Sequence, residues 1–440
     1  MGIINLINDL LWTYILVALL LGCAVWFTLR TRFVQFRMIK EMVRLLGDSG
    51  GKGDAKEKHI SSFQAFAISI ASRVGTGNLA GVATAIAVGG PGAVFWMWVI
   101  ALFGAASSFV ESTLAQLYKV RGKDSFIGGP AYYMRKGLKQ PWMGTVFAVL
   151  ITITFGFAFN SVQSNTLCAA FEHAFGFDHA IVGGVITIAT LLIIFGGVQR
   201  IAKVSSIIVP VMALGYIALA LIIVAINITE LPAVIKLIVS HAFGWQQALG
   251  GGVGIALMQG IKRGLFSNEA GMGSTPHAHA IADVENPEDQ GEVAMIGVFI
   301  DTFVVLTMTA LVILSSGVLE EMMSTGVKGT PVAQAAFRTG LKGFGPAFVA
   351  ICLLFFAFST IVGWYFFARQ NVQYLFGKKA VVPFSLIVVV FVFLGSLLKV
   401  DLVWNLSDLF NGLMVIPNLM ALIVLAGTVA KAAKGEKVEF

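Results

Sequence analysis

The chain has 440 residues and a net charge of +7, and 57% of its residues are hydrophobic while only 12% are charged. Soluble domains average about 45–50% apolar and about 25% charged residues, so these values exclude a water-soluble globule, a disordered chain and a collagen-like chain. The cysteines, Cys23, Cys168 and Cys352, stand alone in apolar runs, which excludes a disulfide framework.

Apolar runs of spanning length predict an all-α membrane protein with eleven transmembrane helices. In chain order they lie at residues 10–29, 62–89, 92–118, 143–172, 180–198, 204–226, 248–268, 291–317, 346–368, 380–398 and 403–430. The first run is preceded by nine residues without Lys or Arg, and no small-residue cleavage site follows it. We therefore expect a retained helix and not a cleaved signal peptide.

The basic residues predict the orientation of the chain. When the loops are assigned alternately to two sides, 24 of the 30 Lys and Arg residues fall on one side, five fall on the other, and Arg73 lies within a span. The positive-inside rule then places the N-terminus outside and the C-terminus in the cytoplasm, in the inner (plasma) membrane. We read the basic excess as a topology signal and not as a nucleic-acid surface.

The order of the spans predicts two groups of five after one additional helix. Residues 1–61 hold that helix and a cytoplasmic amphipathic helix over Arg30–Leu46, followed by a Gly-rich hinge. The expected units are then the first repeat at 62–226, an extracellular linker at 227–247, the second repeat at 248–430, and a cytoplasmic tail at 431–440.

The first span of each group contains a run of helix-breaking residues. Gly75, Thr76, Gly77 and Asn78 lie in the middle of the span at 62–89, and all four residue types favour leaving a helix. The segment Lys262–Ser274 again mixes glycine with small polar residues, and we expect its break at 264–271. Two interrupted spans in corresponding positions of two halves indicate an inverted-repeat transporter with a binding site at the membrane midplane.

Three segments closely resemble the alanine or glycine:cation symporter family. They are Gly75-Thr-Gly-Asn-Leu-Ala-Gly-Val-Ala-Thr-Ala-Ile86, Gly89-Gly-Pro-Gly-Ala-Val-Phe-Trp-Met-Trp98 and Lys262-Arg-Gly-Leu-Phe-Ser-Asn-Glu-Ala-Gly271. The resemblance extends over essentially the whole chain. It implies eleven spans, with one extra helix before a five-plus-five inverted repeat of the leucine-transporter type. It also implies sodium-coupled uptake of small amino acids, chiefly alanine and glycine.

The breaks suit a zwitterionic amino acid. Its carboxylate needs free N–H groups at the N-terminus of a half-helix, where the helix dipole is positive, and free carbonyl groups can accept from its ammonium. We predict Thr76, Gly77 and Asn78 as substrate-binding residues, because glycine lets the backbone approach the ligand closely. A tight helix crossing is the alternative explanation of this motif.

Three further segments supply side chains for the substrate pocket. Gln163 lies near the middle of its span, and its amide can donate to a carboxylate and accept from an ammonium. An ordinary interhelical hydrogen bond is the alternative. Trp364 can limit the pocket to a methyl group or a hydrogen, and Phe266 and Asn268 are weaker candidates in the second break.

Sodium takes oxygen ligands, and neutral oxygens suffice where their geometry is right. Phe356, Ser359 and Thr360 have the spacing i, i+3, i+4, which gathers one carbonyl and two hydroxyl groups on one helix face. The fold resembled implies that the carbonyl groups of Ala71 and Val74, just before the first break, complete this sodium site. Hydroxyl groups that bond back to their own helix are the alternative.

Few ionisable residues lie at membrane depth, and each is a functional candidate. We expect Arg73 to form a structural or gating ion pair with Glu111 in the neighbouring span. Glu269 is the candidate for a coupling proton, which would make the protein a proton symporter; Asp301 and Asp408 have no assigned role.

One loop motif could suggest a metal. His277-Ala-His279 lacks a third ligand at useful spacing and is weak evidence for such a site. We expect it in a solvated cytoplasmic loop at 272–290.

Together these features predict a secondary transporter that imports alanine or glycine with sodium by alternating access. A channel needs a continuous polar lining, which ten core spans with so few polar residues do not supply. No catalytic triad, His-rich metal spacing or nucleotide-binding loop is present, so we predict no enzyme activity and no cofactor besides the coupling ion. The expected partners are the amino acid, sodium and the lipid bilayer, with no obligatory protein partner.

Overall fold

The computed structural model describes residues 2–47, 60–122, 125–244 and 252–433. The described chain is mostly helical, with one small antiparallel hairpin of β1 (Val120–Arg121) and β2 (Phe126–Ile127). In this hairpin Val120 pairs with Ile127 and Arg121 with Phe126.

The helices follow the order of the predicted spans. The first part of the chain contains α1 (Gly2–Leu10), η1 (Leu11–Leu16), α2 (Val17–Arg30), α3 (Val34–Arg37), α4 (Ile39–Gly47), α5 (Ser62–Arg73), η2 (Thr76–Asn78), α6 (Ala80–Gly89), α7 (Gly92–Leu117), α8 (Pro130–Lys136), α9 (Pro141–Ile153), η3 (Thr154–Ala158), α10 (Phe159–Phe175), α11 (His179–Ile194), α12 (Gly197–Ile226), η4 (Ile228–Glu230) and α13 (Leu231–Ala242). The second part contains α14 (Val253–Asn268), α15 (Pro276–His279), α16 (Pro287–Phe299), η5 (Ile300–Leu306), α17 (Thr307–Ser315), α18 (Leu319–Thr325), α19 (Thr330–Leu341), η6 (Lys342–Phe344), α20 (Gly345–Phe376), η7 (Lys378–Ala380), α21 (Val381–Leu397) and α22 (Val400–Ala432).

Eight helical stretches of the described chain are long and apolar enough to cross a membrane. They are Gly2–Arg30, Gly92–Leu117, Pro141–Phe175, Gly197–Ile226, Pro287–Ser315, Thr330–Phe376, Lys378–Leu397 and Val400–Ala432. The other three predicted spans coincide with the interrupted helix α5–η2–α6, with α11 and with α14, which are shorter. The polytopic helical membrane fold is confirmed, and the number of eleven crossings stays a prediction.

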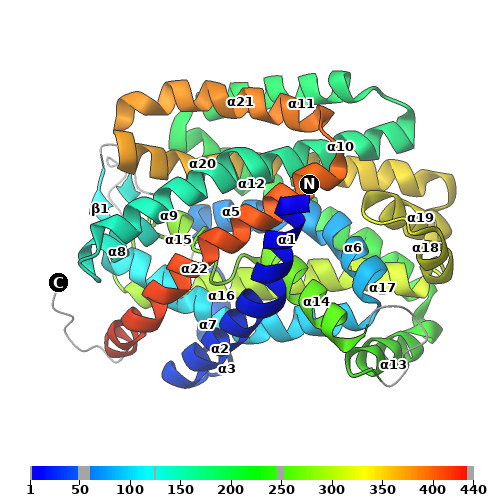
Figure 1. Ribbon diagram of the computed structural model, residues 1–440, viewed down its shortest axis with the longest axis horizontal. Helices are drawn as coiled ribbons and strands as arrows, with labels where there is room; N and C mark the ends of the chain where they lie inside the picture. The colour runs from blue at the N-terminus through cyan, green and yellow to red at the C-terminus, as the bar shows by residue number, and fades with distance from the viewer. Residues whose placement is uncertain (1, 48–59, 123–124, 245–251, 434–440) are drawn as a thin grey trace.

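The outer helices carry the apolar surface that a lipid bilayer requires. Helices α10, α11, α12, α20 and α21 run side by side along the long axis of the molecule (Figure 1). On α11, α12 and α21, side chains such as Ile188, Val211 and Val390 are more than half exposed. Contiguous apolar surface of this kind marks a membrane-facing side in a chain whose backbone groups are satisfied within helices.

The interior is formed by the helices that contain or contact the breaks. Helix α7 packs against α14 and α16, and α5 packs against α12 and α20. Many of their buried side chains are polar, among them Ser69, Ser108 and Thr113, which are at most 3% exposed. This buried polar interior, unlike the apolar outer face, is where a polar ligand can replace its hydration shell.

The first predicted break is confirmed. A capping box of Ser61 and Gln64 starts α5, and the helix ends at Arg73 before Val74, whose ψ of 89° leaves the helical region. One turn of 3₁₀ helix, η2, follows before α6 resumes. The backbone therefore unwinds in the middle of the span at 62–89.

The second break is real, but its predicted position is wrong. Helix α14 continues without interruption to Asn268. The chain then turns through Glu269, Gly271 and Gly273, which all have positive φ angles of 55°, 83° and 84°. The break therefore starts at Glu269, five residues after the start of the predicted segment 264–271. The polar side chains before Asn268 have partners on other helices, so the helix stays regular up to that residue.

Two predicted surface segments also need correction. The expected amphipathic helix over Arg30–Leu46 starts only at Val34, because Arg32 and Phe33 adopt left-handed conformations with φ of 56°. It is then divided into α3 and α4 at Met38, whose ψ of 12° leaves the helical region. The hinge expected after it lies at 48–59, outside the described residues. The loop expected to be solvated at 272–290 is buried from Met272 to Ala282, where it packs against α5 and α7.

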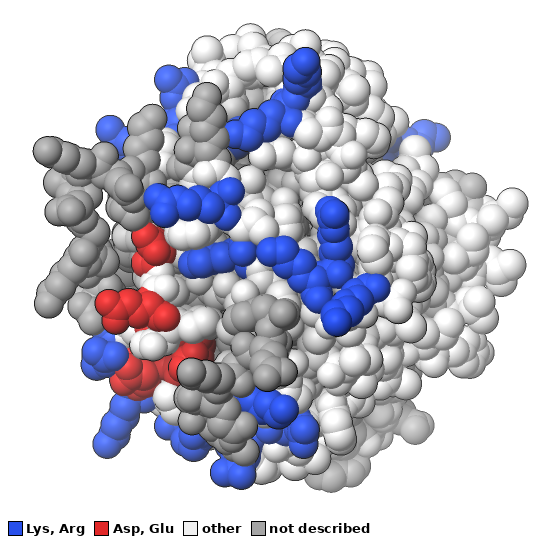
Figure 2. Space-filling model, turned by 90° about the vertical axis from the view of Figure 1, so that its left-hand side faces the viewer, with Lys and Arg blue, Asp and Glu red and all other residues white. Residues whose placement is uncertain are grey.

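The basic residues gather at one end of the molecule. Figure 1 shows the hairpin, α8 and the C-terminal end of α22 at this end, and α13, α18 and α19 at the opposite end. Figure 2 shows many Lys and Arg side chains on the surface of the first of these ends. This end therefore carries a basic surface of the kind that the loop count predicts for one side of the membrane.

Candidate functional site

The break in α5 lies directly against α10. The backbone N–H of Gly75 donates to Asn78 Oδ1 at 2.9 Å, and the N–H of Thr76 donates to Gln163 Oε1 at 3.2 Å. Two amide side chains thus accept from the N–H groups that the unwound backbone exposes. A carboxylate oxygen has the same acceptor chemistry as these amide oxygens and would be held more strongly.

Two buried polar groups beside the break have no hydrogen-bond partner among the described residues. They are the hydroxyl group of Thr76 and the amide nitrogen Nε2 of Gln163. Both side chains are fully buried. Buried donors are normally satisfied, so these two unpaired donors are candidates for contact with a bound ligand.

Thr360 of α20 closes the other side of the break. Its hydroxyl oxygen lies 2.8 Å from the carbonyl oxygen of Ala71 and 3.3 Å from that of Val74. The structure therefore brings together three of the five oxygens predicted for the sodium site. All three are neutral and buried, which is a donor set that suits a hard monovalent cation.

The remaining two predicted sodium ligands lie on the same helix, Ser359 next to Thr360 and Phe356 one turn before it. The hydroxyl of Ser359 donates to the carbonyl oxygen of Phe356 at 3.0 Å and lies 3.4 Å from the Sδ atom of Met212. In this conformation Ser359 follows the alternative expected for hydroxyl groups in helices and bonds back to its own helix. Its role as a ligand stays a prediction.

Gly75 lies between the two groups of predicted ligands. A Cβ atom added to Gly75 would lie 2.6 Å from Thr360 Oγ1 and 3.2 Å from Gln163 Oε1. The position therefore has no room for a side chain, and glycine is needed for this close approach. The expected sodium site and substrate site are direct neighbours across one residue.

Asn78 joins the first break to the last turn of α14 through Asp301. Its Nδ2 donates to Asp301 Oδ1 at 2.7 Å, and the hydroxyl of Ser267 lies 2.9 Å and 3.1 Å from the two carboxylate oxygens. Thr302 Oγ1 lies 3.2 Å from Asp301 Oδ2. The amide of Asn78 is thus engaged by protein groups, and its direct contact with a substrate stays a prediction.

Aromatic rings form a wall next to the break. The ring centroids of Phe159 lie 4.8 Å from those of both Phe266 and Trp364, and the centroids of Phe266 and Trp364 are 5.8 Å apart. Gly77 packs against this wall, because a Cβ there would lie 3.1 Å from a ring carbon of Phe266. The predicted pocket residues Gly77, Phe266 and Trp364 therefore lie together, with Phe159 added by the structure.

Trp364 also contacts the second break. Its indole N–H donates to Glu269 Oε1 at 2.6 Å, and the hydroxyl groups of Ser274 and Ser72 lie 2.7 Å and 3.2 Å from Glu269 Oε2. The carboxylate of Glu269 therefore links α5, the second break and α20. The sequence marked Glu269 as ionisable at membrane depth, but nothing in it indicated these partners.

Asn268 ends helix α14. Its Oδ1 accepts from the backbone N–H of Ala270 at 3.0 Å, and its Nδ2 lies 3.4 Å from Thr302 Oγ1. These contacts stabilise the turn after the helix. A role of Asn268 in substrate binding stays a prediction.

The expected ion pair between Arg73 and Glu111 is wrong. Arg73 donates to the carbonyl oxygen of Ala294 at 2.8 Å and to the hydroxyl groups of Ser108 and Thr275 at 3.1 Å and 3.2 Å. Neutral oxygens from three other segments therefore surround its guanidinium group.

Glu111 binds the second break instead. Its two carboxylate oxygens accept from the N–H groups of Gly271 and Gly273 at 3.1 Å and 3.0 Å, and Asn418 Nδ2 donates to it at 3.1 Å. Free N–H groups of unwound backbone are strong partners for a buried carboxylate. The sequence could not reveal them while the second break was assigned to the wrong residues.

A buried group of three charges lies near the end of the molecule opposite the hairpin. Asp408 on α22 accepts from both Nη atoms of Arg263 at 2.9 Å and from Lys262 Nζ at 2.7 Å. The guanidinium of Arg263 also lies 4.6 Å from the ring centroid of Trp404, and Lys262 lies 5.5 Å from that of Trp12. A cleft of about 120 Å³ opens beside Arg263, Trp404 and Asp408.

This charged group corrects the loop assignment of two residues. The 24 basic residues counted on the cytoplasmic side include Lys262 and Arg263, but these two lie inside α14 and are buried. Without them, 22 basic residues remain on the predicted cytoplasmic side. The excess of basic residues on this side therefore remains, and the predicted orientation is unchanged.

The two histidines of the buried segment have hydrogen-bond partners. His277 contacts Asn371 Nδ2 at 2.8 Å, and His279 contacts Gln290 Oε1 and Ser69 Oγ at 3.0 Å and 3.1 Å. Among the described residues no group of three potential metal-binding side chains exists. These histidines therefore hold the second break against its neighbours.

The family model described as the sodium:alanine symporter family matches residues 1–436. The probable sodium/glutamine symporter GlnT of Bacillus subtilis is 49% identical over 98% of this chain and 90% of its own length. A sodium/proton-dependent alanine carrier protein of Bacillus sp. is 41% identical over 85% of this chain and 87% of its length.

A solved structure has the same fold. The crystal structure of MhsT in complex with L-phenylalanine matches with a TM-score of 0.61 at 15% identity. The match covers 86% of this chain and 98% of MhsT. It supports the helical arrangement described above.

Proposed function

Because the chain belongs to the sodium:alanine symporter family and is therefore a sodium-coupled amino acid symporter and not an enzyme, we propose that it imports alanine and glycine by alternating access. The observation that supports this most is the break in α5. There the hydroxyl of Thr360 approaches two backbone carbonyl groups while unpaired donors of Thr76 and Gln163 lie beside them.

In the proposed binding mode, sodium is coordinated by the oxygens of Ala71, Val74 and Thr360. Phe356 and Ser359 complete the site after the hydroxyl of Ser359 rotates away from its own helix. Oxygen ligands without formal charge can bind sodium at this depth, because they replace its hydration shell without an added buried carboxylate.

The amino acid is proposed to bind on the other side of Gly75. Its carboxylate accepts from the hydroxyl of Thr76 and from Gln163 Nε2, the two donors without a partner among the described residues. Carbonyl groups of the unwound segment accept from its ammonium. Phe266 and Trp364 leave room for only a small side chain beside Gly77.

We propose the orientation and repeat structure that the sequence predicts. The N-terminus lies outside, the basic end of Figure 2 faces the cytoplasm, and eleven spans include repeats at 62–226 and 248–430. One sodium ion that moves through about 100 mV releases about 2.3 kcal/mol, and a tenfold gradient adds about 1.4 kcal/mol. Together these support an accumulation of about 500-fold at one-to-one coupling.

Replacing Thr360 by alanine tests the sodium site. Among the described residues, the hydroxyl of Thr360 is the only side-chain oxygen within hydrogen-bond distance of the carbonyl oxygens of both Ala71 and Val74. Alanine removes this oxygen. We expect the sodium concentration for half-maximal alanine uptake to rise about tenfold or more. Uptake into proteoliposomes at a series of sodium concentrations measures it.

Thr152→Ala is the matched control, because the hydroxyl of Thr152 bonds only to the carbonyl oxygen of Ala148 on its own helix. Its sodium dependence should equal that of the wild-type protein. An unchanged sodium dependence of Thr360→Ala would exclude this site.

The relatives' names add two alternatives, glutamine as substrate and protons as coupling ions. Competition of labelled alanine uptake by the twenty amino acids in proteoliposomes decides between the substrates. If uptake in sodium-free choline buffer at about pH 5.5 equals uptake in sodium, the coupling ions are protons carried by Glu269. Acceleration of labelled uptake by internal alanine separates a carrier from a channel.

Replacing Phe266 by alanine tests the size limit of the pocket. The loss of one ring from the wall opens space next to Gly77, against which the ring packs. We expect glutamine to compete about tenfold better against alanine uptake, because pockets discriminate side chains mainly by shape. The concentration of glutamine that halves alanine uptake measures this change.

Phe171→Ala is the control, since Phe171 packs against Phe175 and Phe177 away from the break. It should leave competition by glutamine unchanged. If Phe266→Ala behaves like this control, Phe266 does not limit the substrate.

A further inference from the structure

A cleft of about 580 Å³ lies where the first transmembrane helix meets the last. Its walls come from the end of α2, from α3 and from the last turns of α22, with Phe109 of α7 at its base. Helices α2 and α22 pack against each other, and both end at the basic end of the molecule (Figure 1). The cleft is separate from both breaks and plays no part in the proposed transport site.

Four cationic side chains line this cleft. They are Arg30, Arg32, Arg37 and Lys431, and none of the described lining residues is acidic. All four are exposed, although Arg37 also interacts electrostatically with Glu292. The remaining three have no ion pair among the described residues, so their charges are available to a ligand.

The backbone turn at the cleft has an unusual conformation. Arg32 and Phe33 both adopt left-handed conformations, with φ of 56°, which non-glycine residues rarely do. This turn ends α2 and leads into α3, so that Arg30 of α2, Arg32 of the turn and Arg37 of α3 line one cleft.

The charged cleft borders apolar surface on the same helices. Leu29 on α2 is 57% exposed and Val424 on α22 is 68% exposed. Val424 itself lines the cleft. A molecule that carries an anionic head and apolar chains would find both kinds of surface side by side here.

We propose that this cleft binds the phosphate group of an anionic phospholipid, with the acyl chains against Leu29 and Val424. Arginine recognises phosphate through two parallel hydrogen bonds, and two arginines and a lysine at the end of membrane helices lie at the level of lipid headgroups. Arg30 reaches across to α22, where its Nη2 lies 3.4 Å from the position of a Cβ on Gly427. Lipid binding would therefore hold the additional first helix to the last helix of the transport core.

Binding of phosphatidylglycerol labelled on its acyl chain to the purified full-length protein in neutral detergent tests the proposal. The triple variant Arg30→Gln, Arg32→Gln, Lys431→Gln should weaken the affinity about tenfold or more. Gly427→Leu fills the cleft without a change of charge and should weaken it about threefold or more. Labelled phosphatidylcholine should bind the wild-type protein about tenfold more weakly than phosphatidylglycerol.

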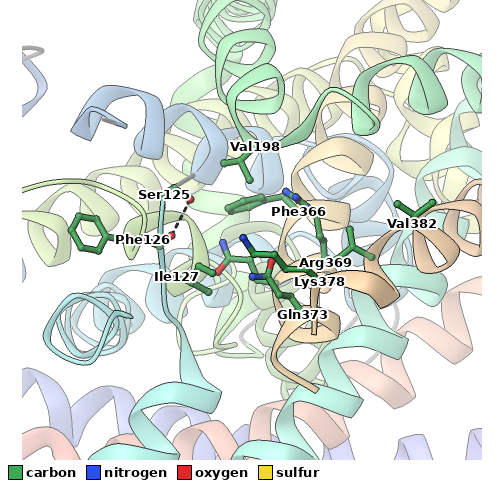
Figure 3. Close-up of a pocket in the computed structure, with 11 residues that line it drawn as sticks. Ser125, Phe126, Ile127, Val198, Phe366, Arg369, Gln373, Lys378 and Val382 are labelled. Carbon is green, nitrogen blue, oxygen red and sulfur yellow. Dashed lines mark hydrogen bonds between the residues drawn. The ribbon is translucent and has the colours of Figure 1, made fainter. Parts of the chain in front are cut away.

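The matched control changes three charges at the same end of the molecule. Arg369 and Lys378 point into a different cavity, of about 210 Å³, between the hairpin, α20 and η7 (Figure 3). Arg369→Gln, Lys378→Gln, Lys379→Gln should keep the affinity within about twofold, because diffuse charge contributes little once a built site holds the phosphate. Unchanged melting temperatures in detergent verify that every variant is folded.

Three outcomes would overturn the proposal. The first is an equal loss in the control variant, which would indicate diffuse attraction to the basic end. The second is wild-type affinity in both cleft variants. The third is displacement of the lipid by an equal concentration of soluble glycerol phosphate, because that would make the site one for a free phosphate. Failure of displacement supports a membrane lipid as the ligand.

Discussion

Alanine at position 75 is expected to lower sodium-coupled uptake about 100-fold or more. The added Cβ would lie 2.6 Å from Thr360 Oγ1 and 3.2 Å from Gln163 Oε1, so both side chains must move. The φ of Gly75 is −139°, which alanine adopts without strain, so the effect comes from the lost space alone. Initial rates of alanine uptake into proteoliposomes, at matched amounts of folded protein, measure the loss.

Gly215→Ala is the control for this substitution. Gly215 lies on the exposed face of α12, and no atom lies within 4 Å of a Cβ placed there. Its uptake should equal that of the wild-type protein. Uptake by Gly75→Ala within about threefold of the wild-type rate would mean that the two sites do not share this residue.

Asparagine at position 408 is expected to lower the free energy of unfolding by about 3–5 kcal/mol. Asp408 is the one anion in contact with Arg263 and Lys262 among the described residues, and all three are buried. Loss of its charge leaves two cations that repel each other away from water. Thermal unfolding in detergent, followed by size-exclusion chromatography, should shift downward by about 5–10 °C.

Asp401→Asn provides the comparison within the same helix and the same cleft. Asp401 pairs with Lys328 at 3.1 Å, but both side chains are more than half exposed. Exposed pairs contribute about 0–1 kcal/mol, so this variant should unfold close to the wild-type temperature. Equal shifts in the two variants would contradict a structural role of the buried group.

The first break could be predicted from residue types alone. Glycine, threonine and asparagine all disfavour helix, and four such residues lie together in the middle of an apolar run. The approach of Thr360 to Ala71 and Val74 came from the family resemblance and not from spacing. The spacing of Phe356, Ser359 and Thr360 fits a self-bonded helix equally well, and Ser359 in fact bonds back to its own helix.

The second break was misplaced because polarity is an ambiguous signal within a membrane helix. Arg263 and Ser267 look like loop residues, but a partner on another helix, Asp408 or Asp301, satisfies each of them. The helix therefore continues to Asn268. The break starts at Glu269, a residue type with no special preference for the left-handed conformation that it adopts here.

The partners of buried charges were the least predictable part. Arg73 was matched to the carboxylate of Glu111 in the neighbouring span, yet three neutral oxygens bind it. Glu111 could not be assigned to backbone N–H groups whose exposure depends on the path of the chain after Glu269. Such contacts depend on how distant segments pack together, and this packing cannot be predicted from the local sequence.

The short unwound segment of α5 supplies ligands to both proposed sites, since Ala71 and Val74 face Thr360 while Thr76 faces Gln163. Sodium or the amino acid, when bound on one side of this segment, therefore fixes the conformation that the other ligand requires. By thermodynamic reciprocity, the factor by which sodium raises the affinity for the amino acid must equal the factor by which the amino acid raises the affinity for sodium. An empty carrier would then hold its ion weakly, which limits uncoupled leakage of the gradient.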